Sequence, residues 1–132
     1  MSGPRSVEQL LELGRRVLED SSRIFEDHDN EAEARQLLAM TLKVTDDELD
    51  AAHEPTVRQR ERYLALIARR AAGEPLPILT GHIEFYGLDL KVRPGVFVPR
   101  PSSELIVERA VKKLRRKRSA VAVDVCAGAG PI

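Results

Sequence analysis

Repeated helix-start signals constrain the fold of this chain more than any other feature of its sequence. In each of them a small polar residue stands three positions before a glutamate or glutamine: Ser6 and Gln9, Asn30 and Glu33, Thr45 and Glu48, Thr56 and Gln59. In such a capping box, the first side chain accepts a hydrogen bond from a first-turn amide, and the second accepts one from the capping residue. We therefore predict four helices, over about 6–19, 30–43, 45–53 and 56–72.

The apolar residues of these segments recur at helical spacing. In the first segment they are Val7, Leu10, Leu11, Val17 and Leu18, with Gly14 on the same stripe. The inward positions expected further along are Leu37, Leu38, Thr41, Leu64, Ile67 and Ala71. One-sided helices joined by short connections pack on their neighbours. Residues 1–73 are therefore expected to form a small helical bundle.

A stretch rich in proline and glycine follows, over residues 74–101. Proline is excluded from helix interiors, so this stretch is expected to be non-helical. Apolar and polar residues alternate on both sides of Tyr86-Gly87, as in a two-stranded hairpin. We interpret 74–101 as a hairpin linker at a domain boundary.

From Ser102 the helical period returns and predicts a helix to about Lys117. The apolar run 120–125 then favours a strand buried on both faces, and it leads into Cys126-Ala127-Gly128-Ala129-Gly130. A buried strand ending in an acidic residue and a glycine-rich turn is typical of the start of a doubly wound nucleotide-binding domain. A G-x-G sequence alone is equally compatible with a plain turn.

Several short motifs stand upstream in a fixed order: Gly73-Glu74-Pro75-Leu76, then Gly81, Phe85 and Gly87, then residues 96–104, Val-Phe-Val-Pro-Arg-Pro-Ser-Ser-Glu. Together with the glycine-rich turn, this order resembles the release-factor glutamine methyltransferases, the PrmC/HemK family. The resemblance covers about residues 56–131. It implies an N-terminal helical domain for substrate recognition, a hairpin, and a class I methyltransferase domain of Rossmann-like α/β fold beginning at 102–132.

The resemblance also implies S-adenosylmethionine as cofactor and methyl transfer to the N5 amide nitrogen of a glutamine in peptide chain release factors. The cofactor-binding residues it implies are Asp124, Cys126, Ala127, Gly128, Ala129 and Gly130, and the possible pocket residues are Phe97, Arg100, Ser103 and Glu104. Two positions depart from the family pattern. Ser102-Ser103 stands where the family has Glu-Thr, and Cys126 takes the place of the first glycine.

The family's catalytic Asn-Pro-Pro-Tyr loop does not occur in this sequence, so no catalytic residue is assigned to it. We therefore expect an N-terminal piece of a longer enzyme, inactive by itself. A buried-type strand without neighbours would expose apolar surface, which predicts pairing with another chain or disorder over 120–125.

The composition of the chain limits the classes of partner and ligand that we expect it to bind. The 21 basic and 21 acidic residues cancel, so no global field favours nucleic acid, and no apolar run suits a membrane span or a signal peptide. Cys126 is the only cysteine, and the histidines have no ligand spacing, so we expect no disulfide and no metal. A cytoplasmic location is the default expectation.

Several residues have two interpretations. Phe97 either packs between the two domains or lies near an adenine, and Arg100 and Glu104 either line a pocket or lie on an ordinary helix surface. Cys126 is expected to be a small buried packing residue rather than a nucleophile. The basic run 112–118 is either a solvated helix end or a contact for ribosomal RNA or an acidic protein surface.

Three functions remain open on the sequence alone. The first is glutamine methylation of release factors by the parent protein. The second is a related methyltransferase that acts on another protein or on a nucleic-acid amine. The third is a truncated module that binds a protein partner without catalysis.

Overall fold

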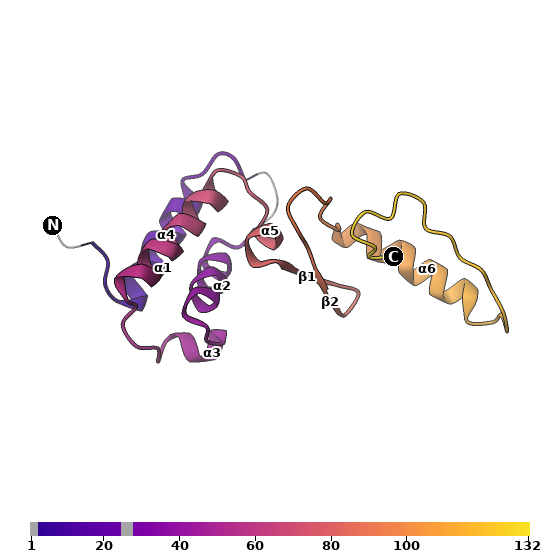
Figure 1. The fold of residues 1–132 in the computed structure, drawn as a ribbon, viewed down its shortest axis with the longest axis horizontal. Coiled ribbons are helices and arrows are strands. Elements are labelled where there is room, and N and C mark those ends of the chain that lie inside the picture. The colour runs from indigo at the N-terminus through magenta and orange to yellow at the C-terminus, as the bar shows by residue number, and fades with distance from the viewer. Residues whose placement is uncertain (1–2, 25–27) are drawn as a thin grey trace. The chain divides into compact units, whose positions relative to one another are not determined.

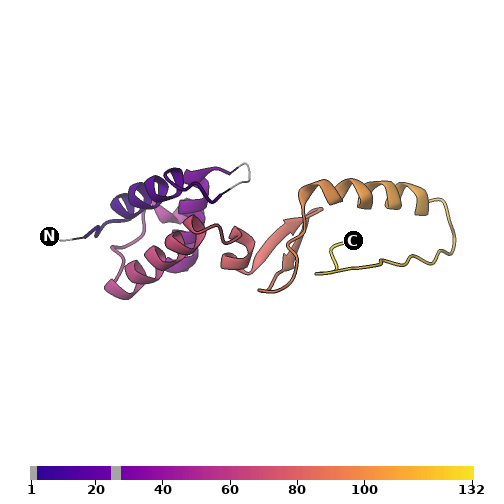
Figure 2. The ribbon, with the colours of Figure 1, turned by 90° about the horizontal axis from the view of Figure 1, so that it is seen from above.

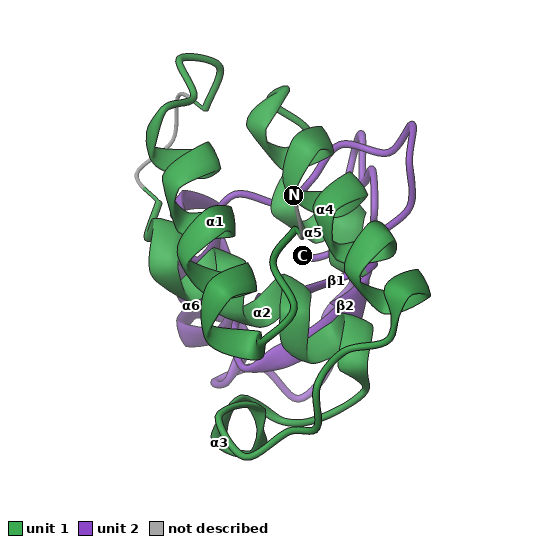
Figure 3. Ribbon diagram, turned by 90° about the vertical axis from the view of Figure 1, so that its left-hand side faces the viewer, with its two compact units in different colours: residues 1–80 green, residues 81–132 purple. Residues whose placement is uncertain are grey.

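The computed structural model describes residues 3–24 and 28–132, and the chain divides into two compact units after Thr80 (Figures 1 and 3). The first unit contains α1 (Val7–Glu19), α2 (Asn30–Leu42), α3 (Asp46–Leu49), α4 (Val57–Ala71) and α5 (Leu76–Thr80). The second contains β1 (His82–Phe85), β2 (Leu88–Lys91), a short 3-10 turn (Pro101–Ser103) and α6 (Glu104–Leu114). Each unit is described by itself.

The helix starts predicted at Ser6 and Thr56 are confirmed. The Gln9 amide donates to Ser6 Oγ over 3.2 Å, and the Gln59 amide donates to Thr56 Oγ1 over 3.3 Å. The glutamine side chain returns the interaction in both cases, because its Oε1 accepts from the amide of the capping residue. These two boxes define the first residues of α1 and α4.

The cap predicted at Asn30 is wrong by one residue. Asp29 caps α2, and its Oδ1 accepts from the amides of Glu31 and Ala32 at 3.0 Å each. A carboxylate suits the positive end of the helix dipole better than a neutral amide does. The expected second half of the box is also occupied elsewhere, because the Glu33 carboxylate binds Arg70.

Two short helices differ from the sequence expectations. The segment predicted as 45–53 begins with Thr45 as its cap but forms only the four residues of α3. The stretch expected to be non-helical contains α5, which includes Pro77. Because the first residues of a helix have amides without intrahelical acceptors, a proline in the first turn removes no hydrogen bond.

The core of the first unit lies among α1, α2 and α4, which pack on one another in pairs (Figures 1 and 2). Its largest fully buried side chains are those of Leu10, Leu18, Leu37, Leu38, Leu49, Tyr63 and Ile67. The predicted inward residues Leu37, Leu38, Thr41 and Ile67 are buried, and Leu64 and Ala71 pack against this cluster. The prediction of a helical bundle is confirmed.

Gly14 on α1 packs directly against Tyr63 and Ile67 of α4. A Cβ at this position would overlap the Tyr63 hydroxyl and would lie only 3.0 Å from Tyr63 Cζ. Gly14 therefore provides the space that the tyrosine ring fills. The Tyr63 hydroxyl is buried without a hydrogen-bond partner among the described residues.

The hairpin of the second unit is confirmed with the predicted turn. Strands β1 and β2 are antiparallel, with Phe85 opposite Leu88 and His82 opposite Lys91. Tyr86 and Gly87 both have positive φ angles, +50° and +74°, as a two-residue hairpin turn of type I′ requires. Helix α6 follows within the predicted range, although none of its residues is buried.

The strand expected at 120–125 is absent. Residues 116–132 form neither helix nor strand, and Val121, Val123 and Val125 are 93%, 81% and 78% exposed. A strand needs hydrogen bonds to a neighbouring strand, and the sheet of the second unit consists of β1 and β2 alone. The beginning of a Rossmann-like sheet is therefore not formed here.

Candidate functional site

The segment that carries the possible pocket residues leads into α6. Phe97 is 68% exposed, and the Arg100 guanidinium lies over its ring, 5.3 Å from the centroid. This is cation–π distance, so Arg100 and Phe97 form a local pair at the surface. Ser103 is half-buried at the start of α6, and its side chain makes no capping hydrogen bond.

Glu104 has a structural contact that the sequence did not indicate. Its Oε1 accepts a hydrogen bond of 2.8 Å from the backbone amide of Tyr86, at the tip of the hairpin. This contact ties the first turn of α6 to the hairpin across 18 residues of chain. Of the possible pocket residues, the structure brings together Phe97 with Arg100 and places Glu104 against the hairpin.

Three residues of the glycine-rich segment after α6 have left-handed backbone conformations. Cys126, Gly128 and Gly130 have φ angles of +63°, +57° and +72°. A Cβ at Gly130 would meet nothing within 4 Å, and the Gly130 amide donates to the Ala127 carbonyl over 2.8 Å. The prediction that Cys126 is buried is wrong, because its side chain is exposed. Cys126 takes the left-handed conformation that glycine adopts more readily.

The basic end of α6 is a solvated surface in this structure. Lys112 pairs with Glu108 one turn earlier, at 2.6 Å, and residues 115–118 are all exposed. Positive charge at this end suits the helix dipole.

A groove in the first unit lies between α1 and α2, with a volume of about 650 Å³. It is lined by Val7, Glu8, Leu11, Glu12, Arg15, Glu31, Arg35 and Asp50. The α1 residues recur at spacings of three and four, and Glu31 and Arg35 are one turn apart on α2. Helical spacing predicts the burial of α1, but it does not show which second helix faces that stripe, so sequence reasoning missed the groove.

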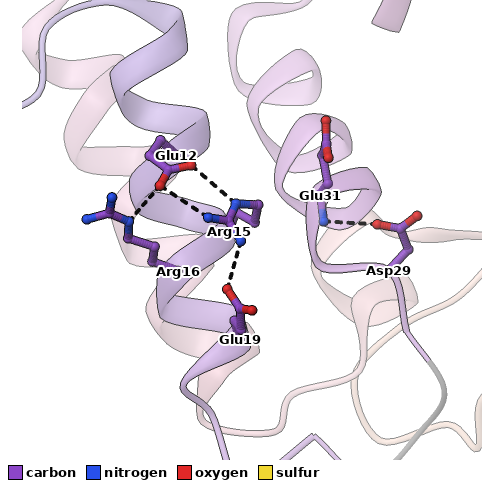
Figure 4. A network of polar contacts seen from close by, with 6 residues as sticks. All are labelled: Glu12, Arg15, Arg16, Glu19, Asp29 and Glu31. Atoms are coloured by element: carbon purple, nitrogen blue, oxygen red, sulfur yellow. Dashed lines mark hydrogen bonds and ion pairs between the residues drawn. The ribbon is translucent and has the colours of Figure 1, made fainter.

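Ion pairs organise the groove walls (Figure 4). Arg15 donates to both oxygens of Glu12 at 3.2 Å and to Glu19 at 2.7 Å, while Arg16 Nε donates to Glu12 at 2.6 Å. Hydrogen bonds from Arg15 and Arg16 lower the pKa of the Glu12 carboxyl. The network therefore holds Glu12 ionised and fixes the direction of two arginine side chains on α1.

The opposite wall has a second network, centred on Arg35. Its guanidinium donates to Asp46 Oδ1 at 2.9 Å and to Asp50 Oδ1 at 3.0 Å. The carboxylates of Asp50 and Asp46 raise the pKa of Arg35. Arg35 thus links α2 to both ends of α3.

Across residues 3–24 and 28–132, no helix is long and apolar enough to cross a membrane. Over the same residues, the histidine, cysteine and acidic side chains form no group that could hold a metal ion.

The comparisons with known proteins agree on one family. Residues 9–81 match the family described as the PrmC N-terminal domain. The release factor glutamine methyltransferase of Burkholderia pseudomallei is 47% identical over 87 residues, 66% of this chain and 28% of that protein. The enzyme of the same name from Bifidobacterium longum is 44% identical over 79 residues, 58% of this chain and 27% of its own.

A third relative matches a larger share of this chain. The release factor glutamine methyltransferase of Agrobacterium fabrum is 37% identical over 106 residues, 76% of this chain and 37% of that protein. The chain thus spans between about a quarter and two fifths of the length of these curated relatives. The matched family covers more than half of the chain, from the last residue of the first capping box to the residue before β1. The chain therefore belongs to the PrmC family of release factor glutamine methyltransferases and contains its N-terminal domain.

Proposed function

We propose that this chain serves S-adenosylmethionine-dependent N5-methylation of a glutamine side chain in peptide chain release factors. The observation that carries the proposal is the match of residues 9–81 to the PrmC N-terminal domain, joined by relatives that are named for this activity. In this account the parent protein acts in the cytoplasm, and residues 1–73 recognise the substrate. Residues 74–101 link this bundle to a methyltransferase domain that begins over 102–132.

The glycine-rich segment fits a cofactor that approaches the backbone closely. Positive φ angles at Cys126, Gly128 and Gly130 turn the chain without bulky side chains, apart from the exposed cysteine. We assign cofactor contacts to Asp124 and to residues 126–130, and substrate or cofactor pocket roles to Phe97, Arg100, Ser103 and Glu104. S-adenosylmethionine supplies the methyl group when it is bound.

The low reactivity of an amide nitrogen explains why a substrate-recognition domain is needed. The lone pair of an amide nitrogen is delocalised into the carbonyl, so this nitrogen is a weak nucleophile. Methylation of an amide therefore depends on holding the substrate in a productive orientation and on polar groups fixed around it. A helical bundle that binds a remote part of the release factor contributes this orientation.

The experiment is a domain exchange in the enzyme of Burkholderia pseudomallei. Residues 1–80 of this chain replace the matching N-terminal part, and release factor is incubated with the chimera and S-adenosylmethionine. Mass analysis of proteolytic peptides should show one added methyl group on a glutamine. A chimera that is folded and binds S-adenosylmethionine, yet leaves every glutamine unmodified, would overturn the proposed substrate. The same analysis on other proteins and on nucleic acid tests the related-methyltransferase alternative.

A second candidate function is supported by the exposure of residues 120–125. Because this segment lacks strand partners, the chain also suits a module that binds a protein without catalysis. Pairing of this segment with a strand of another chain, including a second copy, stays a prediction. Calorimetric titration of the chain with S-adenosylmethionine separates the two functions, since micromolar binding argues against the non-catalytic module and no heat favours it.

A further inference from the structure

The groove between α1 and α2 combines an aliphatic floor with charged walls. Val7 and Leu11 stand one helical turn apart on α1, and both are half-buried against the core cluster. The volume of about 650 Å³ is within the range of sites that hold a ligand or a few side chains. A partner group that enters here therefore contacts hydrocarbon at the bottom and charge at the rim.

The two arginines of the groove are already satisfied within the bundle. Arg15 binds Glu12 and Glu19. Arg35 binds Asp46 and Asp50, and its side chain is only 22% exposed. An incoming carboxylate or phosphate would have to compete with these ion pairs. The groove therefore does not favour an anionic partner.

Two carboxylates of the groove differ from its arginines, because they are not engaged in ion pairs with any residue that the structure describes. Glu8 on α1 and Glu31 on α2 are exposed, and neither carboxylate has an ion-pair partner within the described residues. They stand on opposite walls, and in Figure 4 the Glu31 carboxylate points away from the cap formed by Asp29. The lining contains four carboxylates and two guanidinium groups, a formal net charge of −2. The potential of the groove thus favours a cation.

We propose that this groove docks a basic segment of the protein substrate, with a lysine or arginine side chain seated between Glu8 and Glu31. Its aliphatic stem would cover Val7 and Leu11, because long basic side chains bury the stem while the charged head stays in water. The head would then form charge-assisted hydrogen bonds with carboxylates of both helices. This proposal rests on the proposed function, since the partner is the release factor, and the negative lining disfavours nucleic acid.

The first measurement uses the full 132-residue chain and a simple probe. The probe is an acetylated and amidated peptide of repeating Lys-Leu-Ala units, and its control has glutamate in place of lysine. Backbone amide shifts should change for residues 7–15 and 31–35 with the basic peptide only. The affinity should fall as salt is raised, since exposed charges are screened. Shifts confined to other residues, or no shifts, would overturn the proposal.

Matched variants test the two carboxylates. The pair Glu8→Gln and Glu31→Gln removes the charge but preserves the shape, and it should weaken peptide binding about two- to thirtyfold, as expected for two exposed ion pairs. Glu54→Gln with Glu61→Gln is the control, because both residues are exposed, lie outside the groove and have the same charge change. Equal weakening by both pairs would show a general charge effect and contradict the site. Amide spectra of each variant confirm that it is folded.

Titration with release factor separates this proposal from the function on which it rests. Binding that the groove pair weakens and the control pair does not supports both. Equal binding by wild type and the groove pair rejects the groove but keeps the proposed function. If the basic peptide binds in the groove and release factor does not bind at all, the groove stands and the proposed substrate fails.

Discussion

Arg70 of α4 and Glu33 of α2 face each other inside the first unit through two parallel hydrogen bonds. Arg70 Nε donates to Glu33 Oε2 at 2.8 Å, and Nη2 donates to Oε1 at 3.1 Å, with the two side chains 3% and 11% exposed. A third bond runs from Arg70 Nη1 to the carbonyl of Glu74, at 3.1 Å. The guanidinium thus joins two helices and fixes the chain just before α5.

Removing either partner of this pair should be strongly destabilising. Arg70→Met or Glu33→Leu leaves one buried charge uncompensated, and we expect a loss of about 3–5 kcal/mol in the free energy of unfolding. The double variant should lose much less than the sum of the single losses. Urea denaturation measures each value, and Arg69→Ala is the control, with an expected loss below about 1 kcal/mol because its pair with Glu74 is exposed. Additive losses in the double variant would contradict a direct pair.

Gly14→Ala should destabilise the packing of α1 on α4. Its Cβ would overlap the Tyr63 hydroxyl, and overpacking of this kind costs about 1–3 kcal/mol. Tyr63→Phe alone should be close to neutral, because the hydroxyl that it removes is buried without a partner. Thermal unfolding of the double variant should recover part of the loss. A Gly14→Ala protein more stable than wild type by about 0.5–1 kcal/mol, the gain that alanine brings to a helix interior without steric conflict, would show that the added methyl group does not meet Tyr63.

The same tyrosine predicts how stability changes at high pH. Burial raises the pKa of the Tyr63 hydroxyl above its ordinary value. In the unfolded chain tyrosine ionises near pH 10, while the folded chain keeps its proton, so the unfolded state binds fewer protons there. The contribution to stability is therefore fully present below about pH 10 and is lost progressively as the pH rises further.

Absorbance of tyrosinate in a Tyr86→Phe background reports on Tyr63 alone, because the chain has two tyrosines. Ionisation should coincide with unfolding as followed by circular dichroism. The Tyr63→Phe variant should lack this part of the alkaline decline. A folded protein in which Tyr63 titrates near pH 10 would contradict its burial.

Glu104→Ala should loosen the tip of the hairpin. It removes the acceptor for the Tyr86 amide, and the loss of a hydrogen bond worth about 1 kcal/mol should speed amide exchange at Tyr86 about fivefold. Glu104→Gln keeps an acceptor oxygen and should exchange more slowly than the alanine variant. The control is Glu108→Ala, one turn along the same helix. Unchanged exchange at Tyr86 in Glu104→Ala would show that the contact is not formed in solution.

Local chemistry explains what the sequence predicted well. Capping boxes at Ser6 and Thr56 and the Tyr86-Gly87 turn involve residues within a few positions of one another, so their pattern can be read directly. The shift of the α2 cap to Asp29 shows the limit of this reasoning. Asp29 and Asn30 are both residue types that can cap a helix. Asp29 is the cap in the structure, where Glu33 binds Arg70 and so does not complete a capping box with Asn30.

Contacts between residues far apart in the sequence could not be predicted from the spacing of residue types along the chain. The ion pair of Glu33 with Arg70 joins residues 37 positions apart, and the groove depends on how two helices face each other. The apolar run 120–125 has the pattern of a buried strand, but a strand forms only where another strand lies beside it. The cofactor and pocket roles assigned to Asp124, to residues 126–130 and to the pocket residues remain predictions, since such roles consist of contacts with molecules other than this chain.

Competition for release factor tests the central claim most directly, that this chain contains a release-factor recognition domain. The enzyme of Burkholderia pseudomallei methylates release factor in the presence of increasing amounts of the 132-residue chain, and methyl incorporation is followed with time. We predict that the chain slows methylation in a saturable manner and that added release factor relieves the inhibition. Unchanged methylation at the highest amount of correctly folded chain would contradict the account.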